Sequence, residues 1–329
     1  MQRRQFLQAA GAGALGVALG PLARADETYP NRPIRLIVPF APGGLNDATA
    51  RLWAEMVKGH FGATFVVDNR GGAGGTIGAI EASRAQPDGY TLLLGSSTTQ
   101  VLNPTLMARV PYDPLKDFTA VSIFAVATGA IAVHPSVPAT TLKELIDYIR
   151  ANPGKLSYGS AGTGTNSHLA GELFKHLAGG LDMTHISYRG AGPAIADLVS
   201  GHIVIGSPHM TAQLLELHKA GKLRVLAVAA PARLQGAPET PTGSEAGLPG
   251  LIATTFNGIV APGGTPPSVV ARIDAATQMA MTEGDFAQRL LAAGFEPLRG
   301  VGGATAQRYI ADELARLAPV VKTIGFKLE

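Results

Sequence analysis

Cysteine is absent from all 329 residues of the chain. Without it the chain cannot form disulfides, hold a metal through thiolates, use a thiol nucleophile or carry the acylated cysteine of a lipoprotein. Charged residues are scarce at 16%, and aromatic residues reach only 6%, with the single tryptophan, Trp53, expected in the core. Hydrophobic residues make up 46%. This balance excludes a disordered chain, predicts a large buried core and, with the length, favours about two domains.

Surplus positive charge is confined to the N-terminus. Arg3, Arg4 and Arg24 account for three of the 27 basic residues, which leaves 24 basic against 24 acidic residues after Ala25. A balanced chain lacks the basic surface on which nucleic-acid affinity depends, so nucleic acid is excluded as a partner despite a pI of about 9.2.

Residues 1–25 have the pattern of an export signal. Arg3 and Arg4 precede an Ala/Gly/Leu-rich run that ends at Leu22, and Ala23-Arg24-Ala25 forms a small-x-small cleavage site. The run is too short and too rich in glycine for a good transmembrane anchor. We expect cleavage after Ala25 and export of the mature chain, either by the twin-arginine route or by the general secretory route.

The stretch from Ile34 to Leu52 predicts a strand, a glycine turn and a helix. Its apolar run to Phe40 is typical of a buried strand, Gly43 and Gly44 interrupt the run, and apolar residues then recur at helical spacing. A helix start leaves backbone N–H groups unpaired and carries partial positive charge, so this turn is a candidate anion site. An ordinary α/β connection is the alternative. Asp47 is expected to start the helix rather than to contact an anion, which it would repel.

A second stretch, residues 155–174, repeats this pattern. Its strand leads into a small-residue turn, Gly159 to Gly164, and a helix that begins near Asn166 or Ser167. Two anion-ready turns in separate halves of one chain favour a binding role. His168, in the first turn of this helix, is the one histidine that we place at a ligand site, although it could equally well serve only to hold the loop.

Strands and helices alternate along the rest of the chain. Thr141 and Glu144 form a predicted capping box, the apolar residues 119–133 predict two strands or one long strand, and the hydroxyl residues 96–99 follow a strand at the edge where open α/β sheets bind ligands. The alternation predicts two doubly wound α/β domains, each with a mainly parallel sheet.

Signatures of catalysis and nucleotide binding are scarce. No serine has the glycine pattern of a nucleophile elbow, and the eight histidines show no short metal-binding spacing. The glycines of residues 72–78 approach a dinucleotide fingerprint, but their spacing is wrong, so close packing of a loop on a helix is favoured. An exported hydrolase or lyase acting through Ser96, Ser160 or His168 remains the alternative, because sequence alone does not show whether a triad assembles in space.

Several motifs follow one another in a recognisable order: YPNRPIRLIVPFAPGGLND, VVDNRGGAGGTIGA, PDGYTLLLG, KLSYGSAGTGTNSHLAGELF, YRGAGPAIADLVSG and APGGTPPSVVARI. With them, essentially the whole mature chain resembles the Bug family, the periplasmic solute receptors of tripartite tricarboxylate transporters. The resemblance implies a periplasmic Venus-flytrap receptor of two α/β domains, with the chain crossing between them twice and a small carboxylate in the cleft. It also implies monomeric function with the membrane subunits of the transporter as partners, and neither cofactor nor catalysis.

With the Pro- and Gly-rich residues 231–250 as the connector back to the first domain, we expect residues 26–127 and 251–329 in the first domain and residues 128–250 in the second. Carried over by position, ligand contacts are expected from both domains. The first-domain candidates are Phe40, Gly43, Gly44, Asn46, Asp47, Ser96, Ser97 and Thr98. The second-domain candidates are Ser160, Ala161, Gly162, Thr163, Thr165, Asn166, His168, Pro208 and His209.

One segment departs from the family pattern. After Gly201 the family commonly continues with Q-V-D and then F-D-N, whereas here Val204 and Pro208 stand where acidic residues are usual. Without these two acidic residues, an amine-bearing ligand would lose possible ion-pair partners, and a purely anionic or aromatic acid would no longer be repelled by them. His209 offers a hydrogen-bond donor in this segment, so we expect ligand specificity to be decided on this side of the cleft.

Overall fold

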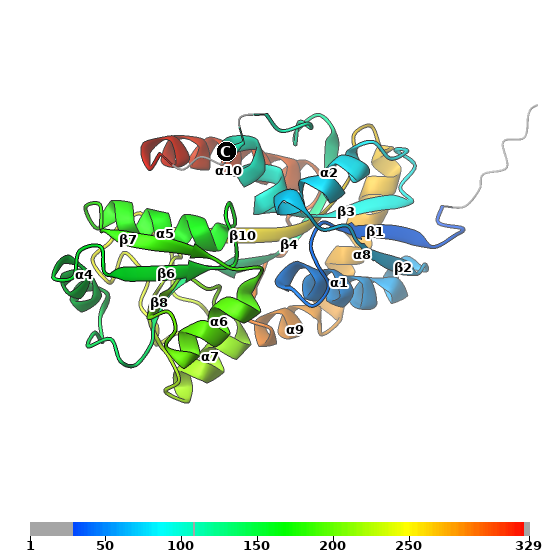
Figure 1. The fold of residues 1–329 in the computed structure, drawn as a ribbon. Coiled ribbons are helices and arrows are strands. Elements are labelled where there is room, and N and C mark those ends of the chain that lie inside the picture. Colours follow the sequence, from blue (N-terminus) through cyan, green and yellow to red (C-terminus); the bar gives the residue numbers. More distant parts are fainter. Residues whose placement is uncertain (1–28, 108, 326–329) are drawn as a thin grey trace, which may run out of the picture.

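The computed structural model describes residues 29–107 and 109–325, which form two lobes, each built around one sheet (Figure 1). The expected export signal, residues 1–25, lies outside the described residues. The first sheet has the strand order β11-β4-β10-β3-β1-β2. Its strands are β1 (Ile34–Val38), β2 (Phe65–Asn69), β3 (Thr91–Ser96), β4 (Phe118–Thr128), β10 (Thr254–Pro262) and β11 (Glu296–Pro297).

The second sheet has the strand order β7-β6-β8-β5-β9. Its strands are β5 (Ala130–Val133), β6 (Leu156–Ser160), β7 (Met183–Ser187), β8 (Ile205–Gly206) and β9 (Arg224–Val228).

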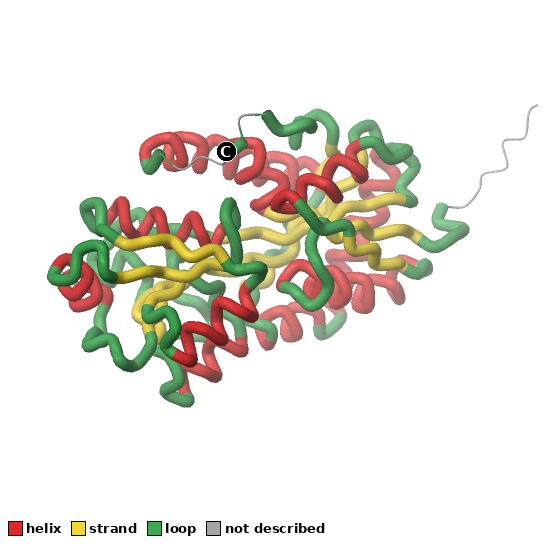
Figure 2. The backbone as a smooth tube through the Cα atoms, viewed as in Figure 1, coloured by secondary structure: helices red, strands yellow, loops and turns green. Residues whose placement is uncertain are grey.

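Helices cover both faces of each sheet (Figure 2), as predicted for doubly wound lobes. One core of the first lobe contains α1 (Leu45–Phe61), α8 (Pro267–Glu283) and α9 (Phe286–Ala292), and the other contains α2 (Thr76–Ser83), α3 (Asn103–Leu106) and α10 (Gly303–Thr323). In the second lobe α4 (Leu142–Arg150) and α5 (Asn166–Leu177) share one core, and α6 (Ala191–Ser200) and α7 (Ala212–Lys219) share the other.

The prediction of mainly parallel sheets is wrong for both lobes. In the first sheet β1 is parallel to β2 and β3, but β10 runs antiparallel to β3 and β4, and β11 runs antiparallel to β4. In the second sheet β6 is parallel to β7 and β8, but β5 runs antiparallel to β8 and β9. The exceptions include the strands that carry the chain between lobes. In the first lobe β4 leaves and β10 returns, and in the second lobe β5 enters and β9 leaves. The two strands of each pair therefore lie side by side in opposite directions, without the crossover helix that a parallel pair requires.

The lobes are joined where the outgoing and returning segments pass each other. Gly129 alone separates β4 from β5; its N–H donates to the carbonyl of Ala253 at 2.9 Å, and its carbonyl accepts from the N–H of Ala229 at 2.7 Å. A Cβ on Gly129 would lie 3.0 Å from the Ala253 oxygen, so glycine permits this close passage. The end of α10 adds a further link, because Val320 and Ile324 pack against the core of the second lobe.

Most local predictions for the described residues are confirmed. The capping box of Thr141 and Glu144 is formed, and residues 119–133 make two strands. Trp53 is fully buried and donates its indole N–H to the Thr277 hydroxyl at 3.1 Å. The sequence did not reveal the π-helix at Thr98–Leu102, a rare structure with no known composition signal that often occurs at functional sites.

Gly258→Ala should destabilise the first lobe. An added Cβ in the middle of β10 would lie 2.5 Å from the carbonyl oxygen of Ser122 on the paired strand β4, so the two strands would have to move apart. We expect the free energy of unfolding to fall by about 1–3 kcal/mol, the usual cost of overpacking, as measured by urea denaturation.

Gly59→Ala is the matched control. Gly59 is exposed on α1, and an added Cβ there meets open space. This variant should be neutral or more stable by up to about 1 kcal/mol, because alanine is the better helix former. Equal losses in the two variants would contradict the crowding between β4 and β10.

Candidate ligand-binding site

The turn between β1 and α1 leaves the start of a 17-residue helix open. Residues 41–44 are exposed, Gly43 has a φ of +80°, and Gly44 is the N-cap without a side-chain capping bond. The first N–H groups of a helix have no acceptor inside it. Leu45 and Asn46, the first two helical residues, therefore carry backbone donors that a bound anion could use.

Asp47 holds this turn together. Its carboxylate is buried and accepts from the Gly43 N–H at 2.9 Å, the Asn69 side-chain amide at 2.9 Å and the Arg51 guanidinium at 3.0 Å. Burial alone would raise the pKa of Asp47, but the bonds from Arg51, Gly43 and Asn69 outweigh it and keep the pKa below its usual value. The geometry matches the expected role at the helix start. Phe40 belongs to the same turn, because its carbonyl also accepts from Asn69, at 3.0 Å.

The hydroxyl residues at the end of β3 and just after it are buried and only partly hydrogen-bonded. Ser97 Oγ accepts from the Phe256 N–H at 2.9 Å, and Thr98 begins the π-helix. Ser96 Oγ has no partner within the described residues, and neither has Oδ1 of Asn257, the residue paired with Ser96 on the neighbouring β10. Buried polar atoms without partners are costly, so a ligand or ordered water near these atoms would be stabilised.

The loop before the second helix start is already hydrogen-bonded within the protein. From Ala161 to Thr165, each successive backbone N–H donates to an acceptor of the same lobe. These acceptors are Ser167 Oγ at 2.8 Å, Ser160 Oγ at 3.2 Å, Ser187 Oγ at 2.9 Å, His168 Nδ1 at 3.2 Å and the Gly162 carbonyl at 3.3 Å. The two turns are therefore not equivalent: the α1 start is open, whereas the loop before α5 is preformed and offers mainly side-chain groups and the first N–H groups of α5.

Asn166 ties this loop to the crossing strands. It is the first residue of α5, directly after the N-cap Thr165, and its side-chain amide donates to the Thr254 carbonyl at the start of β10 at 2.9 Å. Its Oδ1 is buried and has no partner within the described residues. Thr163, by contrast, is exposed, and its hydroxyl donates to Ser187 at 3.0 Å.

His168 and His185 stack beneath the loop. Their ring centroids lie 3.6 Å apart with the planes inclined by 10°. Burial, reinforced by His185, lowers the pKa of His168 to about 4, while Glu172 opposes and Lys175 adds to this effect. Because neutral His168 accepts the Gly164 N–H through Nδ1, its role in holding the loop is evident, and direct contact with ligand stays a prediction.

Ser160 and His185 form a close pair, with Ser160 Oγ 2.7 Å from His185 Nε2. Ser160 is only 1% exposed, and the nearby Glu172 accepts from the Tyr158 hydroxyl and from Lys175. Within the described residues no hydrogen bond joins His185 to a carboxylate. The pair thus lacks the third group that orients the base in a catalytic triad.

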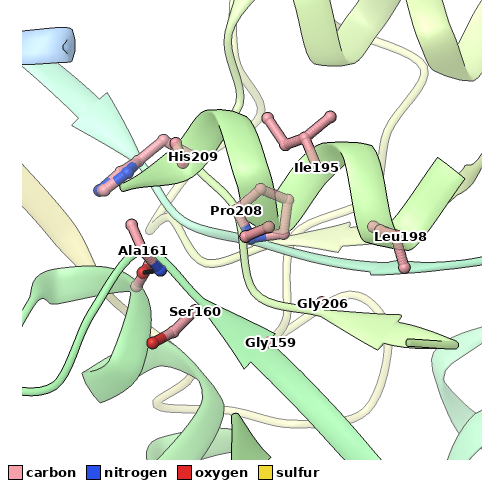
Figure 3. A pocket seen from close by; sticks show the side chains of 11 residues that line it. Gly159, Ser160, Ala161, Ile195, Leu198, Gly206, Pro208 and His209 are labelled. Atoms are coloured by element: carbon pink, nitrogen blue, oxygen red, sulfur yellow. Dashed lines mark hydrogen bonds between the residues drawn. The ribbon is translucent and has the colours of Figure 1, made fainter. Parts of the chain in front are cut away.

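Pro208 and His209 follow β8 and border a small cavity under α6, together with Ser160 and Ala161 (Figure 3). The structure thus brings four of the predicted second-lobe residues together around one space of about 10 Å³. The larger cavity of about 220 Å³ lies between the lobes at α7 and α9 and is lined by none of the predicted site residues.

Several positioning residues were not found from the sequence. Asn69 and Ser187 are the last residues of β2 and β7, and in register they lie beside Val38 and Ser160. The rule that ligands gather at the carboxyl ends of parallel strands could have identified both. Asn257 lies in the middle of an antiparallel strand, where no such signal exists.

Comparison with known proteins decides the family. Residues 49–326 match the family described as tripartite tricarboxylate transporter family receptor. The chain belongs to this family. Membership confirms the resemblance noted in the sequence, and both the family and the fold are those of periplasmic solute receptors. Within residues 29–107 and 109–325, no helix is long and apolar enough to span a membrane.

Individual receptors of known sequence or structure are similar over nearly the whole chain. Protein BugT of Bordetella pertussis is 35% identical over 304 residues, which cover 92% of each chain. A protein of R. palustris solved with adipate is 33% identical, with a TM-score of 0.84 over 91% of this chain and 99% of its own. MatC from Rhodopseudomonas palustris, solved with bound malate, is 31% identical, with a TM-score of 0.80 over 89% of this chain and 100% of its own.

The stability of the receptor should fall as the pH is lowered from about 6.5 to about 4. In the unfolded chain the pKa of His168 is near 6.5, whereas in the folded chain the pKa of His168 is about 4. Between these pH values only the unfolded chain takes up the proton, so acid favours unfolding. Melting temperatures at pH 7 and pH 4.5 measure the effect. In His168→Asn, whose Oδ1 can still accept the Gly164 N–H, the melting temperature should fall less between pH 7 and pH 4.5. An equal fall in both proteins would contradict a buried, neutral His168 as the cause.

Proposed function

We propose that this receptor binds a small carboxylate between its lobes and passes it to the membrane subunits of a tripartite tricarboxylate-type transporter. The observation that carries the proposal is the open start of α1, where an exposed glycine turn and uncapped N–H groups follow the carboxyl end of β1. An anion there completes hydrogen bonds that the helix cannot. The structures of relatives with adipate and malate support the same chemical class.

The helix start alone cannot hold the ligand. A helix terminus stabilises an anion by about 0.3–2 kcal/mol, whereas micromolar affinity requires about 8 kcal/mol. Charge-assisted hydrogen bonds, strengthened when the cleft closes and water leaves, supply much of the remainder. The unpartnered Ser96 Oγ in the first lobe can donate to a carboxylate, whereas Asn166 Oδ1 in the second can accept only from a hydroxyl group of the ligand or from a bound water.

Closure of the lobes would be the signal that the transporter reads. We propose that residues 26–127 with 251–329 move as one body and residues 128–250 as the other, about the junctions β4–β5 and β9–β10. The position of Gly129 between β4 and β5, and the change of sheet from β9 to β10, support these boundaries. Ligand then selects the closed population.

A hydrolase acting through Ser160 is the second candidate, and the contact between Ser160 and His185 is the observation that favours it. It is the weaker one, because Ser160 is buried, His185 has no carboxylate partner among the described residues, and the family is one of receptors. We propose instead that Ser160 shapes the loop by accepting the Gly162 N–H.

Leu45→Pro should weaken carboxylate binding without removing α1. Proline is tolerated as the first helical residue, and the preceding Gly44 has the extended conformation, φ −83° and ψ 174°, that proline requires before it. The variant removes one donor that we assign to the ligand. Because a hydrogen bond to a charged group contributes about 1.5–3 kcal/mol, affinity should fall roughly ten- to 150-fold. Calorimetry with mono-, di- and aromatic carboxylates measures the affinities of the variant and of the unaltered protein.

Leu45→Ala is the control, because it loses the same packing but keeps the N–H. It should bind nearly as well as the unaltered protein. Equal affinities of the proline and alanine variants would exclude a contact at this N–H. If no carboxylate in the panel produced heat or a thermal shift with the unaltered protein, the carboxylate function itself would be wrong.

Export should remove residues 1–25. We expect intact-mass analysis of the periplasmic fraction to find a chain that begins at Asp26, and replacement of Arg3 and Arg4 by lysine to block export only if the twin-arginine route is used. A cytosolic protein that retains residues 1–25 would contradict the proposed location.

A further inference from the structure

We propose that His209 and the small cavity beside it make this receptor prefer carboxylates whose far end is small and uncharged over dicarboxylates of the same length. The inference rests on the proposed function and concerns the end of the ligand that enters the second lobe. It gives His209 the role of a residue that determines specificity.

The cavity offers no charge to pair with a second carboxylate. It lies between α6 and the ends of β6 and β8 (Figure 3), and none of its eleven lining residues is lysine, arginine, aspartate or glutamate. Apolar side chains of α6 form one wall, and two serines also belong to the lining. The residues concerned are Ala194, Ile195 and Leu198, and Ser160 and Ser167. An ionised group without a partner is strongly disfavoured in such surroundings.

The cavity is also small. Its volume of about 10 Å³ is close to the space that one water molecule needs. A methyl or hydroxyl group fits there, whereas a solvated carboxylate does not. All of its lining comes from the second lobe, so closure of the lobes as rigid bodies would not enlarge it.

His209 is the one titratable residue in the lining, and its Nε2 atom is buried with no partner within the described residues. Burial lowers the pKa of His209 to about 4, so the ring is neutral near pH 7. A neutral imidazole can exchange a hydrogen bond with a hydroxyl or carbonyl group, but it cannot neutralise a carboxylate. Figure 3 shows its ring beside Ala161, on the loop that we assign to ligand binding.

The backbone fixes the position of His209. On one side the Pro208 carbonyl accepts from the Ala130 N–H at 2.8 Å, and on the other the Met210 N–H donates to the Thr128 carbonyl at 2.7 Å. Both partners belong to the strands that join the lobes. A shift of the His209 backbone to admit a larger or charged group would therefore disturb the junction between β4 and β5.

Among lysines and arginines, Arg189 is the nearest in sequence to a residue of the cavity lining. It is exposed and lies two positions before α6. Its charge is screened by solvent and lies outside the cavity lining. If Arg189 instead recruited a second carboxylate, dicarboxylates would bind well in the unaltered protein, and Arg189→Gln would abolish that binding selectively.

The test uses calorimetry with matched pairs of equal carbon number: butyrate and succinate, valerate and glutarate, hexanoate and adipate. In each pair that binds, the monocarboxylate should bind at least tenfold more tightly to the unaltered protein at pH 7.5. His209→Lys should shift this ratio at least tenfold toward the dicarboxylate, because it places a cation at the cavity. His209→Asn, neutral and able to donate, should keep the original preference, and Arg189→Gln should not alter it.

Dicarboxylates that bind the unaltered protein as tightly as their partners would overturn the inference while leaving the carboxylate function intact. A ratio that His209→Lys leaves unchanged, with the melting temperature preserved, would overturn the role of His209. If the lysine variant does not fold, the ratio in the unaltered protein decides alone. Failure of every carboxylate to bind would overturn the proposed function, and this inference with it.

Discussion

Backbone N–H groups in the turn before a helix need acceptors, and the two glycine turns of the receptor differ in how many the protein supplies. Before α5, hydroxyls, an imidazole and a carbonyl accept every N–H from Ala161 to Thr165. At α1, Asp47 accepts only the Gly43 N–H, and Gly44 provides no side-chain cap. The open turn is therefore suited to an anion, whereas the loop before α5 is preformed.

The crossing strands connect these two surfaces. Asn166 at the α5 start donates to Thr254 of β10, while Asn257, three residues further along the same strand, donates to Thr49 of α1. Each of these asparagines has a buried side-chain oxygen without a partner in the described part of the chain. The same strand thus touches both helix starts and carries polar atoms that a ligand or water would satisfy.

The sequence predicted the fold well because its signals are local. Apolar runs, the Thr141 capping box and glycine turns set the positions of strands and helices, and the order of motifs identified the family. The direction of the crossing strands was mispredicted, because pairing of β4 with β10 joins segments far apart in the chain. Pattern alone also made the two helix starts look equivalent. Only the structure shows that Ser187 and His168, from a neighbouring strand and the helix itself, accept the N–H groups of the loop before α5.

The most direct test is a crystal structure of the protein purified together with its natural ligand. The account predicts a carboxylate oxygen within about 3 Å of the Leu45 or Asn46 backbone nitrogen, with the lobes closed and the far end of the ligand beside His209. A ligand found elsewhere, such as in the cavity between α7 and α9, with the start of α1 facing only water, would contradict it.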